Sequence, residues 1–305
     1  MSRVRQALFL FPVILLLAGC GVPAKTVEPA QALAVESFLA DITRNVAGDR
    51  MTVDSLIPEG LDPHAFDPTP QDVARISQSQ VLIINGAGLE GWLQPVLENA
   101  GGERLVIEAC AGLEARPHVD NEASDEHTGE IDPHFWLDPI SVVRYVENIR
   151  DGLSQVDPAN ASAYAQNAES YIAQLRELDG WIRQQIETIP PERRLLVTNH
   201  ESFGYYADRY GLKVIGAIIT SASSNAAPSA QELARLAEAI RATGAPAIFL
   251  ETGTNQQLAE QLAVETGIRV VTGLQTHSLA LPGSSEADYI HMMRYNTEKI
   301  VQALQ

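Results

Sequence analysis

The stretch PANASAYAQNAESYIAQLRELDGWIRQQIETI, residues 158–189, decides the fold. Pro158 suits the first helical turn, and Pro190 and Pro191 end the pattern because proline cannot continue a helix. At 1.5 Å per residue such a helix is roughly 45–50 Å long, enough to run the length of the molecule and join two lobes. Apolar residues recur in it at steps of three and four, the period of one helix face: Tyr164, Ala168, Tyr171, Leu175, Leu178, Ile182 and Ile189.

Short apolar strands alternate with helical patterns on both sides of this helix, which is typical of α/β architecture. The predicted fold class is therefore α/β, with two small lobes of parallel sheet joined by the long helix. Ligand sites in such proteins usually lie in the cleft between the lobes. Strands are predicted at 52–57, 81–84, 105–107, 195–198, 214–218, 247–250 and 270–272, and helices of the first half at 38–47, 70–78, 90–99 and 140–153.

The first twenty residues, MSRVRQALFLFPVILLLAGC, have the form of a secretory signal peptide. Their apolar run is too short for a membrane span. The ending Leu17-Ala18-Gly19-Cys20 looks like a bacterial lipobox, in which Cys20 becomes the lipidated first residue after cleavage. The alternative is a plain signal peptide with an incidental cysteine. We therefore predict an exported protein on the periplasmic or extracytoplasmic face, anchored in the membrane through Cys20.

These signals divide the chain into five expected parts. They are a signal peptide at 1–19, a lipidated tether at 20–29, an N-terminal α/β lobe at 30–155, a spine helix at 156–190 and a C-terminal α/β lobe at 191–305.

Composition excludes several classes of protein. The formal net charge is −18, from 21 Lys+Arg and 39 Asp+Glu, whereas a nucleic-acid binder needs a basic surface to neutralise phosphates. Two cysteines exclude a disulfide scaffold and a thiolate cluster of the zinc-finger type. Cys110, after the predicted strand 105–107, is expected to be a small buried apolar residue.

Four of the seven histidines occupy equivalent places in the predicted fold. His64 and His134 lie in proline-flanked loops of the first half, and His200 and His277 follow strands of the second half. Open α/β sheets bind ligands at the carboxyl ends of their strands. Each histidine alone is read most simply as a surface loop residue, but four in matching settings indicate a metal site. Imidazole suits Zn, Cu and Ni better than Mn or Ca.

The other three histidines differ in kind. His291 lies within a helical pattern and is interpreted as structural. The other two lie in an acidic segment without periodicity, which is either a metal-capture loop or a solvated insert; its candidate groups are His118, Asp120, Glu122, Asp125, Glu126 and His127.

Four short motifs follow one another along the chain. They are SLIPEGLDPH at 55–64 with DPTP at 67–70, DPHFWLDP at 132–139, TNHESFGYY at 198–206, and MMRYN at 292–296. Together and in this order they resemble the metal-binding solute-binding lipoproteins of zinc and manganese ABC transporters. The resemblance covers essentially the whole chain after the signal peptide.

This resemblance implies two small α/β lobes, a rigid spine helix and a metal in the interlobe cleft. It implies a protein that captures Zn²⁺ with high affinity and delivers it to a membrane ABC permease, so that the ion is transported ligand rather than catalytic cofactor. In the family a histidine at the third ligand position suggests zinc and a carboxylate suggests manganese; His200 favours zinc, with manganese or another divalent metal as the alternative. We expect a monomer that touches the membrane only through its lipid anchor, with a periplasmic metallochaperone as a further partner.

The fourth ligand position departs from the family pattern. His277 stands where the family usually has an aspartate or glutamate, so that the implied ligands are His64, His134, His200 and His277. Four neutral imidazoles would leave the +2 charge of the ion uncompensated, which costs free energy unless a carboxylate is near. Glu201 and Glu251 each follow a strand of the second half and are candidates for that role. In the alternative, a water or a carboxylate takes the fourth position and His277 stays outside.

Three rival functions were weighed. GAGLEG at 86–91 is a formal G-x-G-x-x-G after a strand, with Glu108 at the distance expected for dinucleotide binding, but it is not in the first βα unit. A zinc hydrolase needs an open coordination position and a general base. Glu201, next to His200, is a candidate general base, although the sequence contains no His-Glu-x-x-His. The third rival is a surface adhesin. We predict no enzyme activity.

Overall fold

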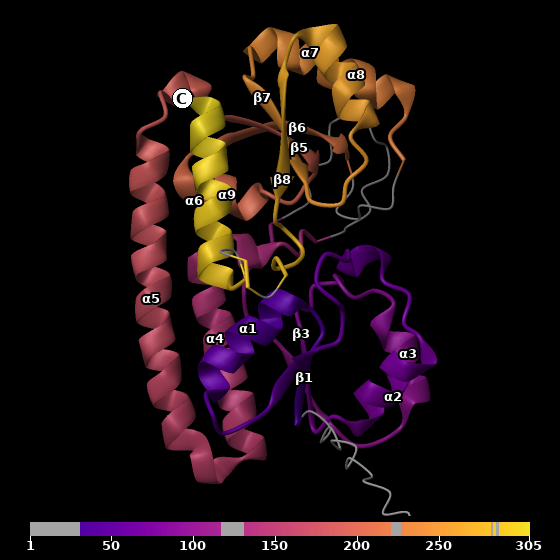
Figure 1. Ribbon diagram of the computed structural model, residues 1–305, viewed down its shortest axis with the longest axis vertical. Helices are drawn as coiled ribbons and strands as arrows, with labels where there is room; N and C mark the ends of the chain where they lie inside the picture. The colour runs from indigo at the N-terminus through magenta and orange to yellow at the C-terminus, as the bar shows by residue number, and fades with distance from the viewer. Residues whose placement is uncertain (1–30, 117–130, 221–226, 282, 285–286) are drawn as a thin grey trace, which may run out of the picture.

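The computed structural model describes residues 31–116, 131–220, 227–281, 283–284 and 287–305 (Figure 1). The predicted signal peptide and the tether with Cys20 lie outside these ranges. So does the acidic segment with His118, Asp120, Glu122, Asp125, Glu126 and His127. No helix within the described ranges is long and apolar enough to cross a membrane.

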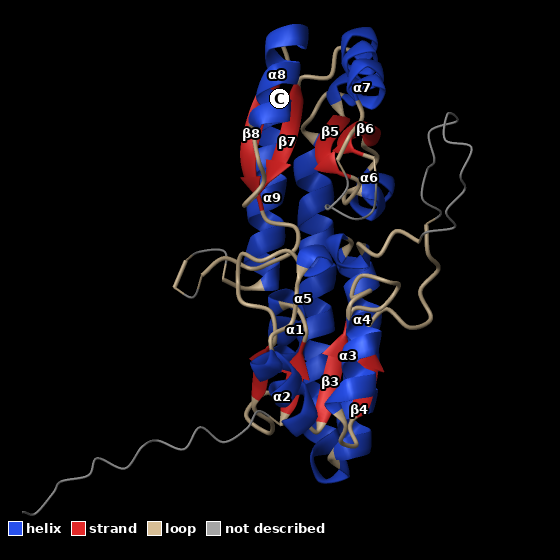
Figure 2. Ribbon diagram, turned by 90° about the vertical axis from the view of Figure 1, so that its right-hand side faces the viewer, coloured by secondary structure: helices blue, strands red, loops and turns tan. Residues whose placement is uncertain are grey.

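Each lobe is built on a four-stranded parallel sheet (Figure 2), which confirms the predicted fold class. The sheet of the N-terminal lobe has the order β2-β1-β3-β4 and that of the C-terminal lobe the order β6-β5-β7-β8, so the two topologies correspond strand by strand. The strands are β1 Ala32–Ala34, β2 Val53–Ser55, β3 Val81–Ile84, β4 Leu105–Glu108, β5 Leu195–His200, β6 Lys213–Ile219, β7 Ala247–Glu251 and β8 Arg269–Leu274.

Helices cover both sheets and connect them. The chain forms α1 Ser37–Ala47, α2 Pro70–Gln78, α3 Leu93–Ala100, α4 Pro139–Val156, α5 Ala161–Glu187, α6 Gly204–Tyr210, α7 Ala230–Thr243, α8 Gln257–Thr266 and α9 Tyr289–Leu304. Short 3-10 turns form η1 Pro63–Ala65, η2 Phe135–Leu137, η3 Pro158–Asn160 and η4 Pro191–Arg193.

The long helix α5 runs beside both lobes (Figure 1). Its 27 residues span about 40 Å. The helix is shorter than predicted because Pro158 starts a 3-10 turn and the α-helix begins only at Ala161. The helix packs against α1 and α4 of one lobe and α9 of the other. Its buried stripe consists of Tyr164, Ala168, Tyr171, Leu175, Leu178, Ile182 and Ile186.

Strand β1 was missed by the sequence analysis. Its three residues are Ala-Leu-Ala, too few to show a period, and alanine is depleted in strands. It nevertheless lies at the centre of the N-terminal sheet, where it pairs with both β2 and β3. The predicted helix start at residue 90 was also wrong, since α3 begins at Leu93 after an irregular turn.

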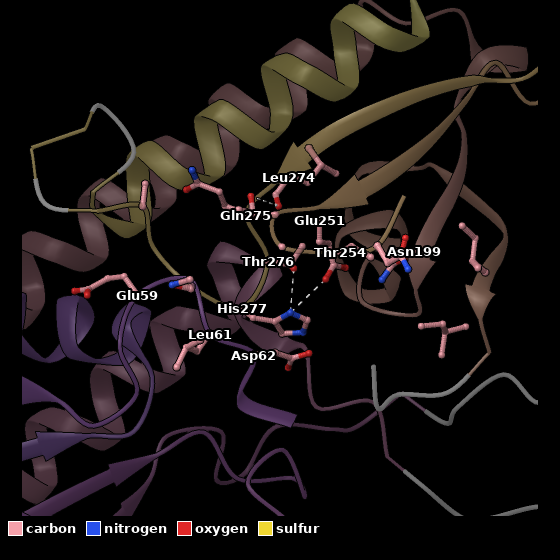
Figure 3. Close-up of a pocket in the computed structure, with 18 of the residues that line it drawn as sticks. Glu59, Leu61, Asp62, Asn199, Glu251, Thr254, Leu274, Gln275, Thr276 and His277 are labelled. Atoms are coloured by element: carbon pink, nitrogen blue, oxygen red, sulfur yellow. Dashed lines mark hydrogen bonds and ion pairs between the residues drawn. The ribbon is translucent and has the colours of Figure 1, made fainter. Parts of the chain in front are cut away.

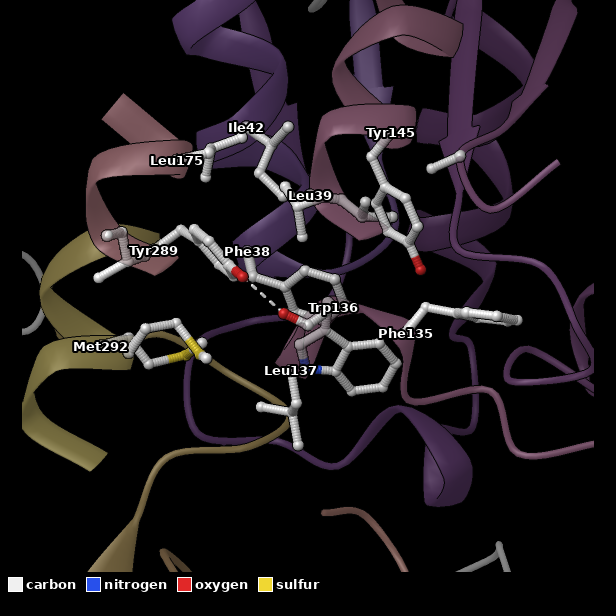
Figure 4. Close-up of a cluster of buried hydrophobic side chains, with 14 of the residues drawn as sticks. Phe38, Leu39, Ile42, Phe135, Trp136, Leu137, Tyr145, Leu175, Tyr289 and Met292 are labelled. Atoms are coloured by element: carbon white, nitrogen blue, oxygen red, sulfur yellow. Dashed lines mark hydrogen bonds between the residues drawn. The ribbon is translucent and has the colours of Figure 1, made fainter. Parts of the chain in front are cut away.

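A single hydrophobic core joins the lobes. Side chains alternate between the two faces of each sheet; in β7, Phe249 joins the core shared with the other lobe, whereas Ile248 belongs to a core of the C-terminal lobe alone. At the centre of the shared core Phe38 stacks on Trp136, with ring centroids 4.6 Å apart (Figure 4). The Tyr289 hydroxyl donates to the Trp136 carbonyl at 2.6 Å.

Trp136 also connects the two lobes directly. Its indole N–H donates to the carbonyl of Thr276, at 2.6 Å. Trp136 lies two residues after His134 and Thr276 one residue before His277, so this bond fixes two histidine-bearing loops against each other.

Candidate metal centre

The four histidines that the sequence analysis selected converge between the lobes. Each offers one ligand atom, and these atoms all lie within 4.8 Å of one another. The Nε2 atom of His134 lies 3.3 Å from Nε2 of His64 and 3.1 Å from Nε2 of His200. The Nε2 atom of His277 is buried and has no hydrogen-bond partner. The histidines come from η1, the loop before η2, the end of β5 and the loop after β8.

Two Asp-Pro-His turns hold the histidines of the N-terminal lobe. Asp62 Oδ1 accepts the backbone N–H of His64 at 2.9 Å, and Asp132 Oδ1 accepts that of His134 at 3.0 Å. Asp132 Oδ1 also lies 2.8 Å from Nδ1 of His134, which places the ring proton on Nδ1 and leaves the Nε2 lone pair for a metal. This contact of Asp132 was not predicted from the sequence, although the repeat of Asp-Pro-His at 62–64 and 132–134 is a signal for it.

Glu251 supports both histidines of the C-terminal lobe. It ends β7, and its carboxylate lies 2.7 Å from Nδ1 of His200. The same carboxylate lies 3.3 Å from Nδ1 of His277 (Figure 3). The contact with His200 has the separation of an ion pair, although Nδ1 there lacks a well-aligned hydrogen bond. The Ser202 hydroxyl donates to the same carboxylate at 3.1 Å. One buried negative charge therefore faces two ligand imidazoles.

The protonation properties of the histidines differ between the lobes. Burial, reinforced by the neighbouring imidazoles, lowers the pKa of His64 far below its usual value. Burial likewise lowers the pKa of His134 to about 4, against the opposing effect of Asp132. For His277 burial is outweighed by Glu251, which raises its pKa. Burial would raise the pKa of Glu251, but His200 and His277 hold it well below the usual range.

Comparison with known proteins gives this geometry a family. Residues 33–303 match the family model described as zinc-uptake complex component A, periplasmic. The chain belongs to this family. It is the metal-binding, solute-binding component of an ABC transporter and not an enzyme, so the zinc-hydrolase interpretation is rejected.

Relatives of this family align over the full chain. The manganese-binding lipoprotein MntA of Halalkalibacterium halodurans is 33% identical over 308 residues, covering 100% of this chain and 99% of the relative. The manganese ABC transporter lipoprotein PsaA of Streptococcus pneumoniae is 30% identical over 311 residues with the same coverage. The relatives are named lipoproteins, in agreement with an extracytoplasmic, lipid-anchored location.

Solved structures of the same type share the fold. The periplasmic zinc-binding protein TroA of Treponema pallidum has a TM-score of 0.81 at 27% identity and covers 91% of this chain and 99% of its own. A manganese-bound periplasmic metal-binding protein of Candidatus Liberibacter asiaticus has a TM-score of 0.79 at 28% identity, covering 90% and 99%.

Three further residues that the sequence singled out lie within the described ranges: Glu201, His291 and Cys110. Glu201 lines a separate cavity of about 300 Å³, together with Arg116 and Asp132. Of the two carboxylates considered for charge compensation, the structure therefore brings Glu251 to the cluster. His291 is exposed on α9 and pairs with Asp288 at 2.6 Å. Cys110 is free and buried, as predicted.

A larger cavity leads to the cluster from one side of the cleft. It measures about 770 Å³, and His277 forms part of its wall (Figure 3). The charged residues among the described lining are all acidic: Glu59, Asp62 and Glu251. A cation can thus approach His277 along a negatively charged wall.

The glycine-rich turn after β3 is already filled by the chain's own carboxylates. Glu90 accepts the backbone N–H groups of Asn85 and Gly86, at 2.5 and 3.2 Å, and Glu108 accepts that of Ala87 at 3.3 Å. A Cβ on Gly86 would lie 2.2 Å from the Glu108 carboxylate, so this glycine makes room for a side chain of the protein. The N–H groups that would hold a pyrophosphate are occupied by anions, which argues against dinucleotide binding.

Proposed function

We propose that this ZnuA-family protein captures Zn²⁺ outside the cytoplasm with His64, His134, His200 and His277 and delivers it to the membrane permease. The observation that carries the proposal is the convergence of four imidazoles, two from each lobe, on one point. Imidazole nitrogen suits zinc, whereas manganese favours carboxylate, carbonyl and water oxygens.

The spacing of the ligand atoms supports a small tetrahedral ion. A Zn–N distance of 2.0–2.1 Å places neighbouring corners of a tetrahedron about 3.3–3.4 Å apart. The Nε2 separations of 3.3 and 3.1 Å around His134 are close to that value. The donor atoms of His64, His134 and His200 therefore need little rearrangement around His134 to bind zinc.

Two carboxylates offset the charge of the ion without binding it. Asp132 contacts Nδ1 of His134, and Glu251 faces Nδ1 of both C-terminal histidines. Such contacts orient a ligand imidazole and increase its basicity. They supply negative charge to a site whose ligands are neutral.

Manganese is the second candidate, because MntA and PsaA are named for it. A direct test is competitive titration of the metal-free protein with Zn²⁺ and Mn²⁺, together with elemental analysis of the protein as isolated. We expect zinc in the isolated protein and far tighter binding of zinc. Manganese in the isolated protein, with tighter binding of Mn²⁺, would overturn the proposed specificity.

Delivery requires the lobes to separate, since each contributes half of the ligands. We propose that the permease drives this movement and that the acidic segment from His118 to His127 raises the local concentration of cations. Lipid anchoring through Cys20, a monomeric state and a metallochaperone partner stay predictions.

A further inference from the structure

The two sheets differ at the position where the strand order reverses. In an open parallel sheet this switch point is where ligands bind, outside the carboxyl ends of two neighbouring strands. In the C-terminal lobe it lies between β5 and β7, which end in His200 and Glu251. In the N-terminal lobe it lies between β1 and β3, and two glutamates occupy it: Glu36 just after β1, and Glu90 in the turn after β3.

Glu36 is buried without a conventional partner. Its residue exposure is 1%, and neither carboxyl oxygen has a hydrogen bond of good geometry. It directly precedes α1, but its side chain does not cap that helix. An ionised carboxylate in such a place would lose its hydration without compensation, so the neutral acid is the stable form.

Glu90 is the natural acceptor for the Glu36 proton. Both of its oxygens accept backbone N–H groups, from Asn85 and Gly86, which favours the charged form of this group. The two carboxyl groups lie within hydrogen-bonding reach of each other. Burial and then the charge of Glu90 raise the pKa of Glu36 well above its usual range, and burial raises that of Glu90 to about 7.

We infer that Glu36 is protonated in the folded protein and donates a hydrogen bond to the Glu90 carboxylate, and that this pair positions the loop of His134. Glu90 holds the backbone of Asn85, whose side-chain amide donates to the carbonyl of Pro133 at 3.1 Å. Pro133 directly precedes His134. The Tyr145 hydroxyl donates to Asn85 Oδ1 and fixes the same amide from α4.

No positive group compensates the pair within the described part of the chain. The titratable groups that face it are the Tyr145 hydroxyl from α4 and the Cys110 thiol after β4, and neither carries positive charge. The protonation of Glu36 therefore does not depend on the metal site, whereas its consequence for His134 rests on the proposed function.

The pH dependence of thermal stability tests the protonation. Glu36→Gln keeps the shape and the donor, Glu36→Met keeps the volume but removes the donor, and Glu238→Gln on exposed α7 is the matched control. A raised pKa in the folded state makes wild-type stability fall as pH rises above the unfolded value of about 4.3. Glu36→Gln removes this loss, so its melting temperature should gain on wild type by roughly 3–5 °C for each pH unit between pH 5 and 8. Glu36→Met should be less stable than Glu36→Gln.

Two further measurements distinguish a protonated Glu36 from an ionised pair of Glu36 and Glu90. Infrared difference spectra of wild type and Glu36→Gln at pH 7 should show the carbonyl stretch of a buried carboxylic acid in wild type only. Zinc affinity should fall roughly tenfold in Glu36→Met, which is the lower limit of the affinity losses seen when a residue that supports a metal ligand is replaced. In Glu36→Gln the zinc affinity should stay near that of wild type. Two results would overturn the inference in favour of an ionised pair. One is the absence of the infrared band. The other is that Na⁺, K⁺ or Ca²⁺ stabilises the metal-free wild type but not Glu36→Gln. Failure of the zinc proposal alone would leave the stability and infrared results unchanged.

Discussion

The two lobes share one topology and supply two histidines each, yet they prepare those histidines differently. In the N-terminal lobe, burial lowers the pKa of His64 and His134, which favours the neutral form of both imidazoles. In the C-terminal lobe, Glu251 raises the pKa of His277 and forms an ion pair that an arriving cation must replace. The same frame thus shifts the pKa of His277 in the direction opposite to the pKa of His64 and of His134.

The switch points repeat this contrast. The C-terminal lobe uses its switch point for the ligand His200 and its carboxylate partner, whereas the N-terminal lobe fills the corresponding point with Glu36 and Glu90. The N-terminal histidines therefore come from loops held by Asp-Pro-His turns. Topology alone does not determine which strand ends bind a ligand; the side chains placed there do.

The largest effect is expected from removing a ligand on either side. His64→Ala, His200→Ala and His277→Ala should each weaken zinc binding by more than the roughly 10–100-fold that loss of a supporting contact costs. Competition with a chelator of known affinity measures this. His291→Ala, on exposed α9, should bind zinc like wild type. Unchanged affinity in both His200→Ala and His277→Ala would show that the site is elsewhere.

A smaller effect on zinc affinity is expected from replacing the carboxylates, and its size should differ between the two lobes. Glu251→Gln should weaken zinc binding toward the upper part of the roughly 10–100-fold range, because Glu251 serves two ligands, and Asp132→Asn toward the lower part. Glu201→Gln is the comparison, since Glu251 is the carboxylate that contacts Nδ1 of His200 and His277. Equal losses in Glu201→Gln and Glu251→Gln would contradict the assignment.

The pH dependence of zinc affinity is the third way to distinguish the lobes. Metal must displace the proton of His277, whose pKa is raised, so as the pH is lowered the affinity should begin to fall before pH 6.5 is reached, by up to about tenfold per pH unit for this proton. His134, with a pKa of about 4, competes only in stronger acid. Isothermal titration at several pH values should show proton release well below four per ion. A four-proton dependence centred at pH 6.5 would mean that the lobes do not differ.

The metal-free C-terminal lobe should respond to pH in the opposite sense. The raised pKa of His277 contributes stability that is fully present below the unfolded value of about 6.5 and is lost as pH rises through the folded value. Mild acid therefore weakens zinc binding while it favours the paired His277 and Glu251 of the metal-free state.

The smallest effect is expected at the contact between the lobes. Trp136→Phe removes the N–H bond to the Thr276 carbonyl and keeps a ring against Phe38. Loss of one hydrogen bond costs about 1 kcal/mol, which lowers the melting temperature by about 2–4 °C in a protein of this size. Calorimetry of the metal-free protein measures it, and an unchanged melting temperature would show that the bond does not hold the lobes together.

Much of the fold was readable from the sequence because its signals are periodic or chemical. The stripe of α5, the strand at 81–84 and the four loop histidines each carry such a signal. Strand β1 carries none, since three residues of alanine and leucine show no period. Glu201 and Glu251 lie at the ends of the neighbouring strands β5 and β7, so the choice between them depends on the direction of each side chain. The pairing of Glu36 with Glu90 depends on β1 lying beside β3. These are contacts between distant segments, and a linear pattern does not encode them.

X-ray absorption spectroscopy of the zinc-loaded protein tests the central claim most directly, because it counts and identifies the atoms bound to the ion. The account predicts four nitrogen ligands at about 2.0–2.1 Å, with the outer-shell scattering of four imidazole rings. An inner shell with a carboxylate or water oxygen in place of one imidazole would contradict it.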